Sequence, residues 1–118
     1  MKKKVYILED DPDLREILVY VLGKEYEIEK AEALDVSEIA AFGPDLILMD
    51  HGLGNSTSDQ NIKSLKNTIP GFATPVILLS GHPDPGRIAL DPLVAGYIQK
   101  PASIGDVREY LHDFFSRS

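Results

Sequence analysis

The sequence contains no cysteine and no apolar run near the roughly 20 residues that would span a bilayer. Disulfide bonds are therefore excluded, and a membrane-spanning helix is not expected. The lysines at positions 2–4 lead directly into a short apolar segment at 4–8, which is too short for the apolar region of a secretory signal peptide. We find no internal repeat and no low-complexity linker. A cytoplasmic protein is expected.

Basic residues are also scarce relative to acidic ones. The chain has 12 lysines and arginines against 19 aspartates and glutamates, a formal net charge of −7. Because nucleic-acid binding depends on basic side chains that neutralise phosphates, direct binding of nucleic acid is not expected. At 118 residues the chain fits a single domain over 1–118, large enough to bury roughly two thirds of the surface of its unfolded state. No further domain is expected in the residues after the last expected helix.

Apolar segments and helical patterns alternate along the whole chain. Strands are predicted at 4–8, 26–29, 45–50, 75–79 and 96–99, each followed by a helical pattern. Parallel strands need crossover connections of this length, so the pattern predicts a three-layer α/β fold, a doubly wound (βα)5 parallel sheet. A flavodoxin-like strand order, 2-1-3-4-5, would place the first and third strands side by side.

Polar residues mark where the helices begin. Asp11 before Pro12 is a strong helix start, Asp35 begins a capping-box spacing, and Ser103 precedes the last helix. The third helix has several possible caps between 56 and 59. Three prolines, Pro83, Pro85 and Pro92, predict that the fourth helix is short and lies near 87–90.

Charged or hydroxyl-bearing residues occur where four of the predicted strands end. The first strand ends in Glu9 and Asp10, the third in Asp50, the fourth in Ser80 and the fifth in Lys100. Asp50 could simply cap the next helix. However, the carboxyl ends of neighbouring parallel strands meet in one crevice, where each pair of carboxylates would repel by roughly 4 kcal/mol. A hard divalent cation such as Mg2+ would compensate. With a hydroxyl and an amine nearby, such a site could support attack of a carboxylate on phosphorus.

Four motifs then identify a resemblance that covers nearly the whole chain. They are Ile7-Leu8-Glu9-Asp10-Asp11, Pro44-Asp45-Leu46-Ile47-Leu48-Met49-Asp50, Leu78-Leu79-Ser80-Gly81 and Gly96-Tyr97-Ile98-Gln99-Lys100-Pro101. In this order, at successive strand ends, they resemble the receiver domains of two-component response regulators.

The resemblance implies that Asp50 accepts a phosphoryl group from a histidine of a partner kinase or phosphotransfer protein. It implies a Mg2+ site formed by Glu9, Asp10, Asp50 and the backbone carbonyl of Gly52, with Asp10 a direct ligand and Glu9 acting mainly through water. The domain would be a regulatory phosphoacceptor rather than an enzyme, catalysing only its own phosphorylation and dephosphorylation.

The resemblance also assigns the switch residues. Ser80 matches the hydroxyl that moves onto the phosphoryl group, Tyr97 the aromatic rotamer switch and Lys100 the cation that pairs with phosphoryl oxygens. Pro101 matches a proline that commonly follows a cis peptide bond, and His82 is a candidate modulator of hydrolysis. Plainer alternatives are a turn for Ser80, a core aromatic for Tyr97 and an exposed strand-end lysine for Lys100. Asp11 is interpreted as a helix cap rather than a ligand.

Two departures from the family pattern leave alternatives open. The loop at 51–60 lacks the proline found in many relatives, so it should be more flexible, and the short fourth helix makes the common dimer of the family uncertain. These departures motivate a second interpretation, a receiver-like binding module that acts without phosphorylation. An aspartyl-nucleophile phosphatase is disfavoured, because Gly52 stands where that chemistry needs a second aspartate. The kinase and the downstream protein target cannot be named from the sequence.

Overall fold

A computed structural model of the chain describes residues 2–53, 56–81, 91–100 and 103–117. Three expectations fall outside these residues: the short fourth helix near 87–90, the candidate modulator His82, and the role of Pro101.

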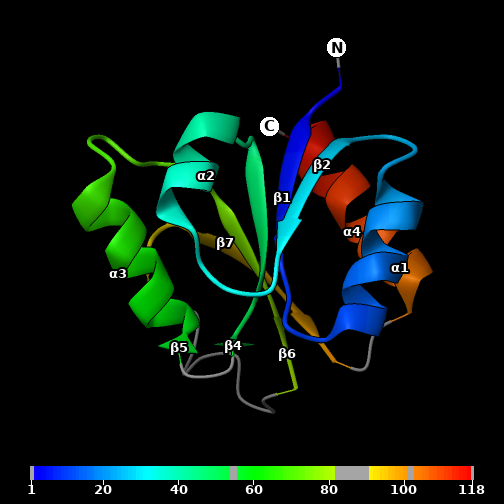
Figure 1. The fold of residues 1–118 in the computed structure, drawn as a ribbon. Coiled ribbons are helices and arrows are strands. Elements are labelled where there is room, and N and C mark those ends of the chain that lie inside the picture. The colour runs from blue at the N-terminus through cyan, green and yellow to red at the C-terminus, as the bar shows by residue number, and fades with distance from the viewer. Residues whose placement is uncertain (1, 54–55, 82–90, 101–102, 118) are drawn as a thin grey trace.

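Five parallel strands form the central sheet (Figure 1). They are β1 (Lys4–Leu8), β2 (Glu27–Ala31), β3 (Leu46–Asp50), β6 (Val76–Ser80) and β7 (Val94–Gln99). Their spatial order is β2-β1-β3-β6-β7. Counted along the chain, this is the predicted order 2-1-3-4-5, so the flavodoxin-like α/β fold is confirmed.

The position of each strand in the sheet explains its sequence. Every residue of β3 and β6 is buried, because both strands lie inside the sheet and are covered on both faces. The edge strands β2 and β7 contain exposed residues. Their predicted boundaries were wrong by one or two residues, since pairing with β1 and β6, rather than local hydrophobicity, sets their lengths.

Four helices lie within the described residues: α1 (Pro12–Leu22), α2 (Val36–Phe42), α3 (Ser58–Thr68) and α4 (Ile104–Arg117). Asp11 caps α1, because its Oδ1 accepts the backbone N–H of Asp13 at 3.0 Å. The Ser103 Oγ accepts the N–H of Asp106 at 3.0 Å, as the spacing predicted. Of the possible caps for α3, Thr57 is the one used.

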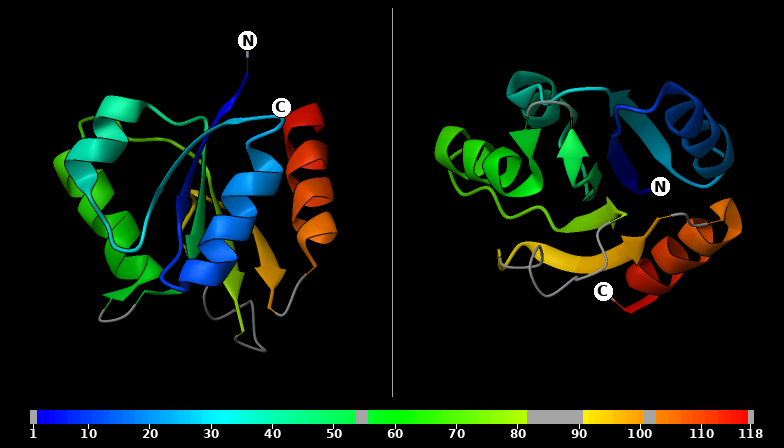
Figure 2. Two further views of the ribbon diagram at one scale, coloured as in Figure 1. Left: turned by 45° about the vertical axis from the view of Figure 1, so that its right-hand side comes forward. Right: turned by 90° about the horizontal axis from the view of Figure 1, so that it is seen from below.

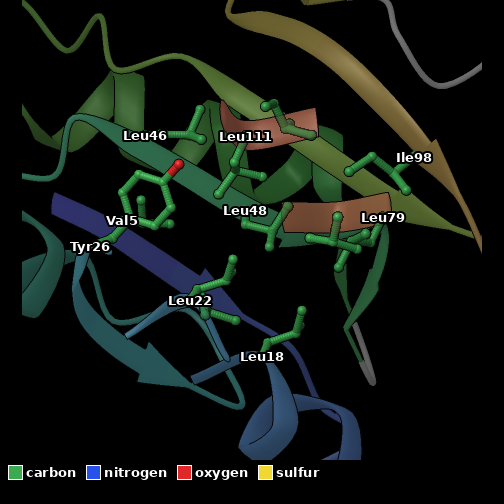
Figure 3. Close-up of a cluster of buried hydrophobic side chains, with 12 residues drawn as sticks. Val5, Leu18, Leu22, Tyr26, Leu46, Leu48, Leu79, Ile98 and Leu111 are labelled. Atoms are coloured by element: carbon green, nitrogen blue, oxygen red, sulfur yellow. The ribbon is translucent and has the colours of Figure 1, made fainter. Parts of the chain in front are cut away.

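The helices form two layers, one on each face of the sheet (Figures 1 and 2). Helices α1 and α4 pack on one face, with a core that includes Val5, Leu18, Leu48, Leu79 and Leu111 (Figure 3). Helices α2 and α3 pack on the other face, over a second core formed by the alternate residues of the same strands. Two apolar faces hold the sheet rigidly between the helices and fix the positions of its strand ends.

A small hairpin follows β3 directly. Strand β4 (Gly52–Leu53) pairs antiparallel with β5 (Ser56–Thr57), and α3 begins at the next residue. The sequence predicted only a flexible loop here and missed the hairpin, because strands of two residues carry no hydrophobic period.

Candidate functional site

The carboxyl ends of the parallel strands lie at one edge of the sheet, the lower edge in Figure 1. Asp50 is the last residue of β3 and Ser80 the last residue of β6. Glu9 follows β1 directly, and Lys100 follows β7. The topology therefore brings together polar residues that are up to 91 positions apart in the sequence.

Glu9 is completely buried. Its Oε1 accepts the Lys100 ammonium at 2.8 Å, and its Oε2 accepts the backbone N–H of Asp11 at 3.2 Å. A guanidinium nitrogen of Arg15 donates to the backbone carbonyl of Glu9 at 2.9 Å. A buried carboxylate needs such partners, because an unpaired charge is costly in a medium of low dielectric constant. Lys100 therefore belongs to the site and is not a solvent-exposed strand-end lysine.

Asp50 is only 7% exposed. The Lys100 ammonium lies 3.3 Å from its Oδ2, and the backbone N–H of Gly52 donates to its Oδ1 at 3.3 Å. Burial, together with the hydrogen bond and the charge of Glu9, raises the pKa of Asp50 to about 7, although the charge of Lys100 acts in the opposite direction. The raised pKa thus reflects burial first and the neighbouring carboxylate of Glu9 second.

Lys100 keeps its proton in this crevice. Burial alone would lower the pKa of its ammonium group. The hydrogen bond to Glu9 and the charges of Asp50 and Glu9 outweigh burial and raise that pKa. One fixed positive charge thus faces two carboxylates.

A third carboxylate, from the exposed Asp10, completes the acidic group. Glu9, Asp10 and Asp50 each offer an oxygen, and these three atoms lie within 4.8 Å of one another. Oxygen ligands of this type suit Mg2+, and the negative charge that raises the pKa of Asp50 would be compensated by a divalent ion. The donor set therefore fits a divalent metal ion.

Ser80 and Tyr97 lie on the adjacent strands β6 and β7. Ser80 is buried, and its carbonyl accepts the backbone N–H of Lys100 at 2.7 Å. Tyr97 is half-buried, packs against the second core, and pairs with Leu78 of β6. Its backbone N–H donates to the phenol oxygen of Tyr110 on α4 at 3.3 Å. Ser80 thus adjoins the site, whereas the Tyr97 side chain lies on the face of the sheet covered by α2 and α3, and its backbone N–H contacts α4.

Sequence reasoning missed two features around Asp50. No role was assigned to Arg15. This residue lies in the first turn of α1, and its guanidinium group donates to the backbone carbonyl of Glu9, six positions earlier. The other is a hydrogen bond between the side chains of His51 and Ser58. The Thr57–Gln60 capping box was a usable signal for the start of α3, and with it for the place of Ser58.

Comparison with known proteins defines the class of this protein. No protein-family model matches the chain. The KDP operon transcriptional regulatory protein KdpE of Escherichia coli is 33% identical over 112 residues, which cover 91% of this chain and 48% of KdpE. The phosphate regulon transcriptional regulatory protein PhoB of Escherichia coli is 31% identical over 108 residues, 87% of this chain and 47% of PhoB. The chain thus spans less than half the length of these curated relatives.

Solved structures agree with the sequence relatives. The N-terminal domain of the nisin resistance regulator NsrR, a lantibiotic response regulator, matches with a TM-score of 0.77 and 28% identity over 96% of this chain and 97% of that domain. A CheY-like receiver domain from Methanospirillum hungatei, at 19% identity, matches in fold with a TM-score of 0.82 over 99% of this chain and 96% of that one. The sequence relatives are response regulators and the structural neighbours are receiver domains, so we assign the chain to the receiver domains of two-component response regulators.

Within the described residues, none of the helices has the length and apolar character needed to cross a membrane.

Proposed function

We propose that this domain is a phosphoacceptor switch, in which Asp50 receives a phosphoryl group from a histidine of a partner kinase or phosphotransfer protein. The observation that supports this most directly is the double contact of Lys100, whose ammonium lies 2.8 Å from Glu9 and 3.3 Å from Asp50. A cation held beside a buried carboxylate is suited to a reaction that adds negative charge at that carboxylate.

Asp50 acts as the nucleophile. One of its carboxylate oxygens forms a bond to phosphorus, the bond from phosphorus to the donor imidazole nitrogen breaks, and the electron pair of that bond returns to the imidazole. The product is an acyl phosphate on Asp50. The attacking form of Asp50 is the carboxylate. A pKa of about 7 therefore makes the protonation state of Asp50 sensitive to the charges around it.

Mg2+ would be held by Glu9, Asp10, Asp50 and the backbone carbonyl of Gly52. When bound, the ion supplies positive charge that offsets the carboxylates and the phosphoryl oxygens. Buried Glu9 keeps its carboxylate in place through Lys100 and the N–H of Asp11. Asp10, which is exposed, offers an oxygen from the solvent side.

Phosphorylation would add a charge of about −1.5 to −2 at Asp50, as other protein phosphates do. Lys100 then pairs with the phosphoryl oxygens, Ser80 donates its hydroxyl to them, and Tyr97 turns inward to fill the space that Ser80 leaves. These movements change the surface around β7 and α4 and so the affinity for a downstream protein. A shift of the population from 1:99 to 99:1 requires a preference of about 5.5 kcal/mol.

The test is labelling of the intact protein with radioactive phosphoramidate, a small donor that contains a phosphorus–nitrogen bond, with and without Mg2+. Wild-type protein should be labelled only with Mg2+, and Asp50→Asn should abolish the label. Asp45→Asn is the matched control, because Asp45 lies just before the opposite end of β3 and accepts the N–H of Lys4 there at 2.8 Å.

Label that persists in Asp50→Asn would exclude Asp50 as the acceptor. A wild-type protein that takes no label and does not bind beryllofluoride would favour the alternative function, a binding module that acts without phosphorylation.

A further inference from the structure

The chain turns back on itself immediately after Asp50. Strands β4 and β5 pair in antiparallel register. One position further out, the backbone N–H of Ser58 donates to the carbonyl of His51 at 2.9 Å. This hydrogen bond also satisfies one of the N–H groups that the first turn of α3 leaves unpaired. The pairing therefore extends to His51, the residue that adjoins Asp50.

A second hydrogen bond joins the same two residues through their side chains. The His51 Nδ1 and the Ser58 Oγ lie 2.6 Å apart. Ser58 is completely buried and His51 is half-buried. The backbone N–H of His51 also donates to the carbonyl of Leu79 in β6 at 2.9 Å. The two residues thus tie the end of β3 to both α3 and β6.

The composition of this loop explains why such a link matters. The segment 51–58 contains Gly52 and Gly54 and no proline. Glycine raises the conformational entropy that a loop must lose to adopt one shape, and proline would lower it. Gly52 also donates its N–H to Oδ1 of Asp50 at 3.3 Å, so the position of Gly52 is coupled directly to the proposed acceptor.

We propose that His51 and Ser58 are positioning residues, whose side-chain hydrogen bond holds Gly52 so that its carbonyl and the Asp50 carboxylate present a preformed Mg2+ site. This inference rests on the proposed function, because Gly52 is a ligand only in that function. Neither His51 nor Ser58 contacts the ion or the phosphoryl group. They replace, with a hydrogen bond, the rigidity that a proline would give this loop.

The expected effect is on metal affinity. Residues that orient the ligands of a metal ion typically contribute about 10–100-fold in affinity or activity. Because the hairpin and the backbone bond between the two residues remain when the side-chain bond is lost, we expect the lower end, about tenfold weaker Mg2+ binding.

The experiment is titration of the full chain with Mg2+ alone, followed by amide NMR at Asp10 and Gly52, which requires no phosphoryl donor. Ser58→Ala and His51→Phe should each weaken binding by about tenfold. His51→Asn, which keeps a polar atom near the position of Nδ1, should stay within about twofold of wild type. Ser116→Ala is the matched control, because the Ser116 hydroxyl donates to the carbonyl of His112 at 2.8 Å near the far end of α4.

Unchanged Mg2+ affinity in Ser58→Ala and His51→Phe would overturn the inference, as would equal loss in His51→Phe and His51→Asn. If a variant does not fold, the wild-type protein alone still tests the proposal. The quantities to measure are the nitrogen chemical shifts of the His51 ring and the hydrogen-exchange rate of the Ser58 amide. Both should change on addition of Mg2+, and invariance of both would contradict the coupling. Failure of the proposed function is distinct, because Mg2+ would then shift no resonance near Asp50 even in wild type.

Discussion

Strand β3 has an aspartate at each end, and the two side chains have opposite environments, one exposed and one buried. Asp45, just before the strand, is exposed and accepts the backbone N–H of Lys4 at 2.8 Å. Asp50, the last residue of the strand, is buried beside Glu9, and its pKa is raised to about 7. At the amino end, water and one backbone donor solvate the charge. At the carboxyl end, several strand ends lie side by side and bring carboxylates close together. Lys100 offsets only part of the repulsion between these carboxylates.

This difference indicates that the carboxyl end of the sheet carries electrostatic strain that the amino end does not. Crowded acidic residues whose charge is only partly compensated lower stability, and a binding or catalytic role explains them better than packing does. Substitutions at the two ends should therefore have effects of different size or sign.

The largest effect is expected for Lys100→Met. The substitution leaves buried Glu9 without its cation, and breaking a buried ion pair costs about 3–5 kcal/mol. Because the raised pKa of Asp50 makes it easier for that carboxyl group to take up a proton, we expect a loss near the lower figure, about 3 kcal/mol in the free energy of unfolding measured with urea at pH 8. Lys4→Met is the control at the amino end, where the ammonium donates to the carbonyl of Phe42 at 3.2 Å. A loss no larger than that of Lys4→Met would remove the distinction between the ends.

An effect of opposite sign is expected for Asp50→Asn. The pKa of Asp50 is about 7 in the folded state, against an ordinary value of 3.8, so the folded state binds more protons and stability is lost as the pH rises from 4 to 7. Removing the carboxylate should therefore stabilise the protein by about 2 kcal/mol at pH 8 and hardly at all at pH 4. Unfolding in urea at both pH values, without metal, measures this.

Asp45→Asn is the matched control for that measurement, and it should destabilise slightly, by about 0.5–1 kcal/mol, through a weaker hydrogen bond to Lys4. Saturating Mg2+ should stabilise wild type more than Asp50→Asn. A destabilised Asp50→Asn at pH 8 would contradict the proposed strain.

The smallest effect is expected for a surface ion pair that belongs to neither end of β3. The ammonium of Lys66 lies 3.1 Å from Asp91, and its side chain is 42% exposed. Lys66→Met should cost about 0.5 kcal/mol at pH 7 and less in high salt, as is usual for exposed pairs. The pKa of Asp91 is lowered: burial opposes this, but the N–H of Leu93 and the charge of Lys66 prevail.

The pH dependence of this pair is the reverse of that of Asp50. A carboxylate with a lowered pKa in the folded state contributes stability above its unfolded pKa and loses it as pH falls through the folded pKa. The difference in unfolding free energy between wild type and Lys66→Met should therefore vanish in acid. A difference that persisted there would show that the aliphatic part of Lys66, rather than its charge, contributes.

Much of the fold could be predicted from local sequence. The apolar segments of β3 and β6 are unambiguous, because strands buried on both faces need no alternation. Asp11 with Pro12, and Ser103 with Asp106, mark helix starts through contacts within three residues. Edge strands were placed less well, since β2 takes its length from pairing with β1.

The candidate site was predicted only in part. The residues Glu9, Asp50 and Lys100 were recognised because strand ends in a parallel sheet share one edge. That Lys100 binds Glu9 as closely as 2.8 Å, that Asp50 is buried, and that His51 reaches Ser58 were not predictable. These facts depend on distances between side chains of separate elements.

The sequence by itself determined which residues occupy the strand ends and where most helices begin, because hydrophobic period and capping act over a few neighbouring positions. The tertiary structure decided which of those charges meet, how deeply they are buried and how the loop after Asp50 is held. Burial sets the effective dielectric constant around Asp50, and the strand order β1-β3-β6-β7 sets the distances on which the pKa of Asp50 depends.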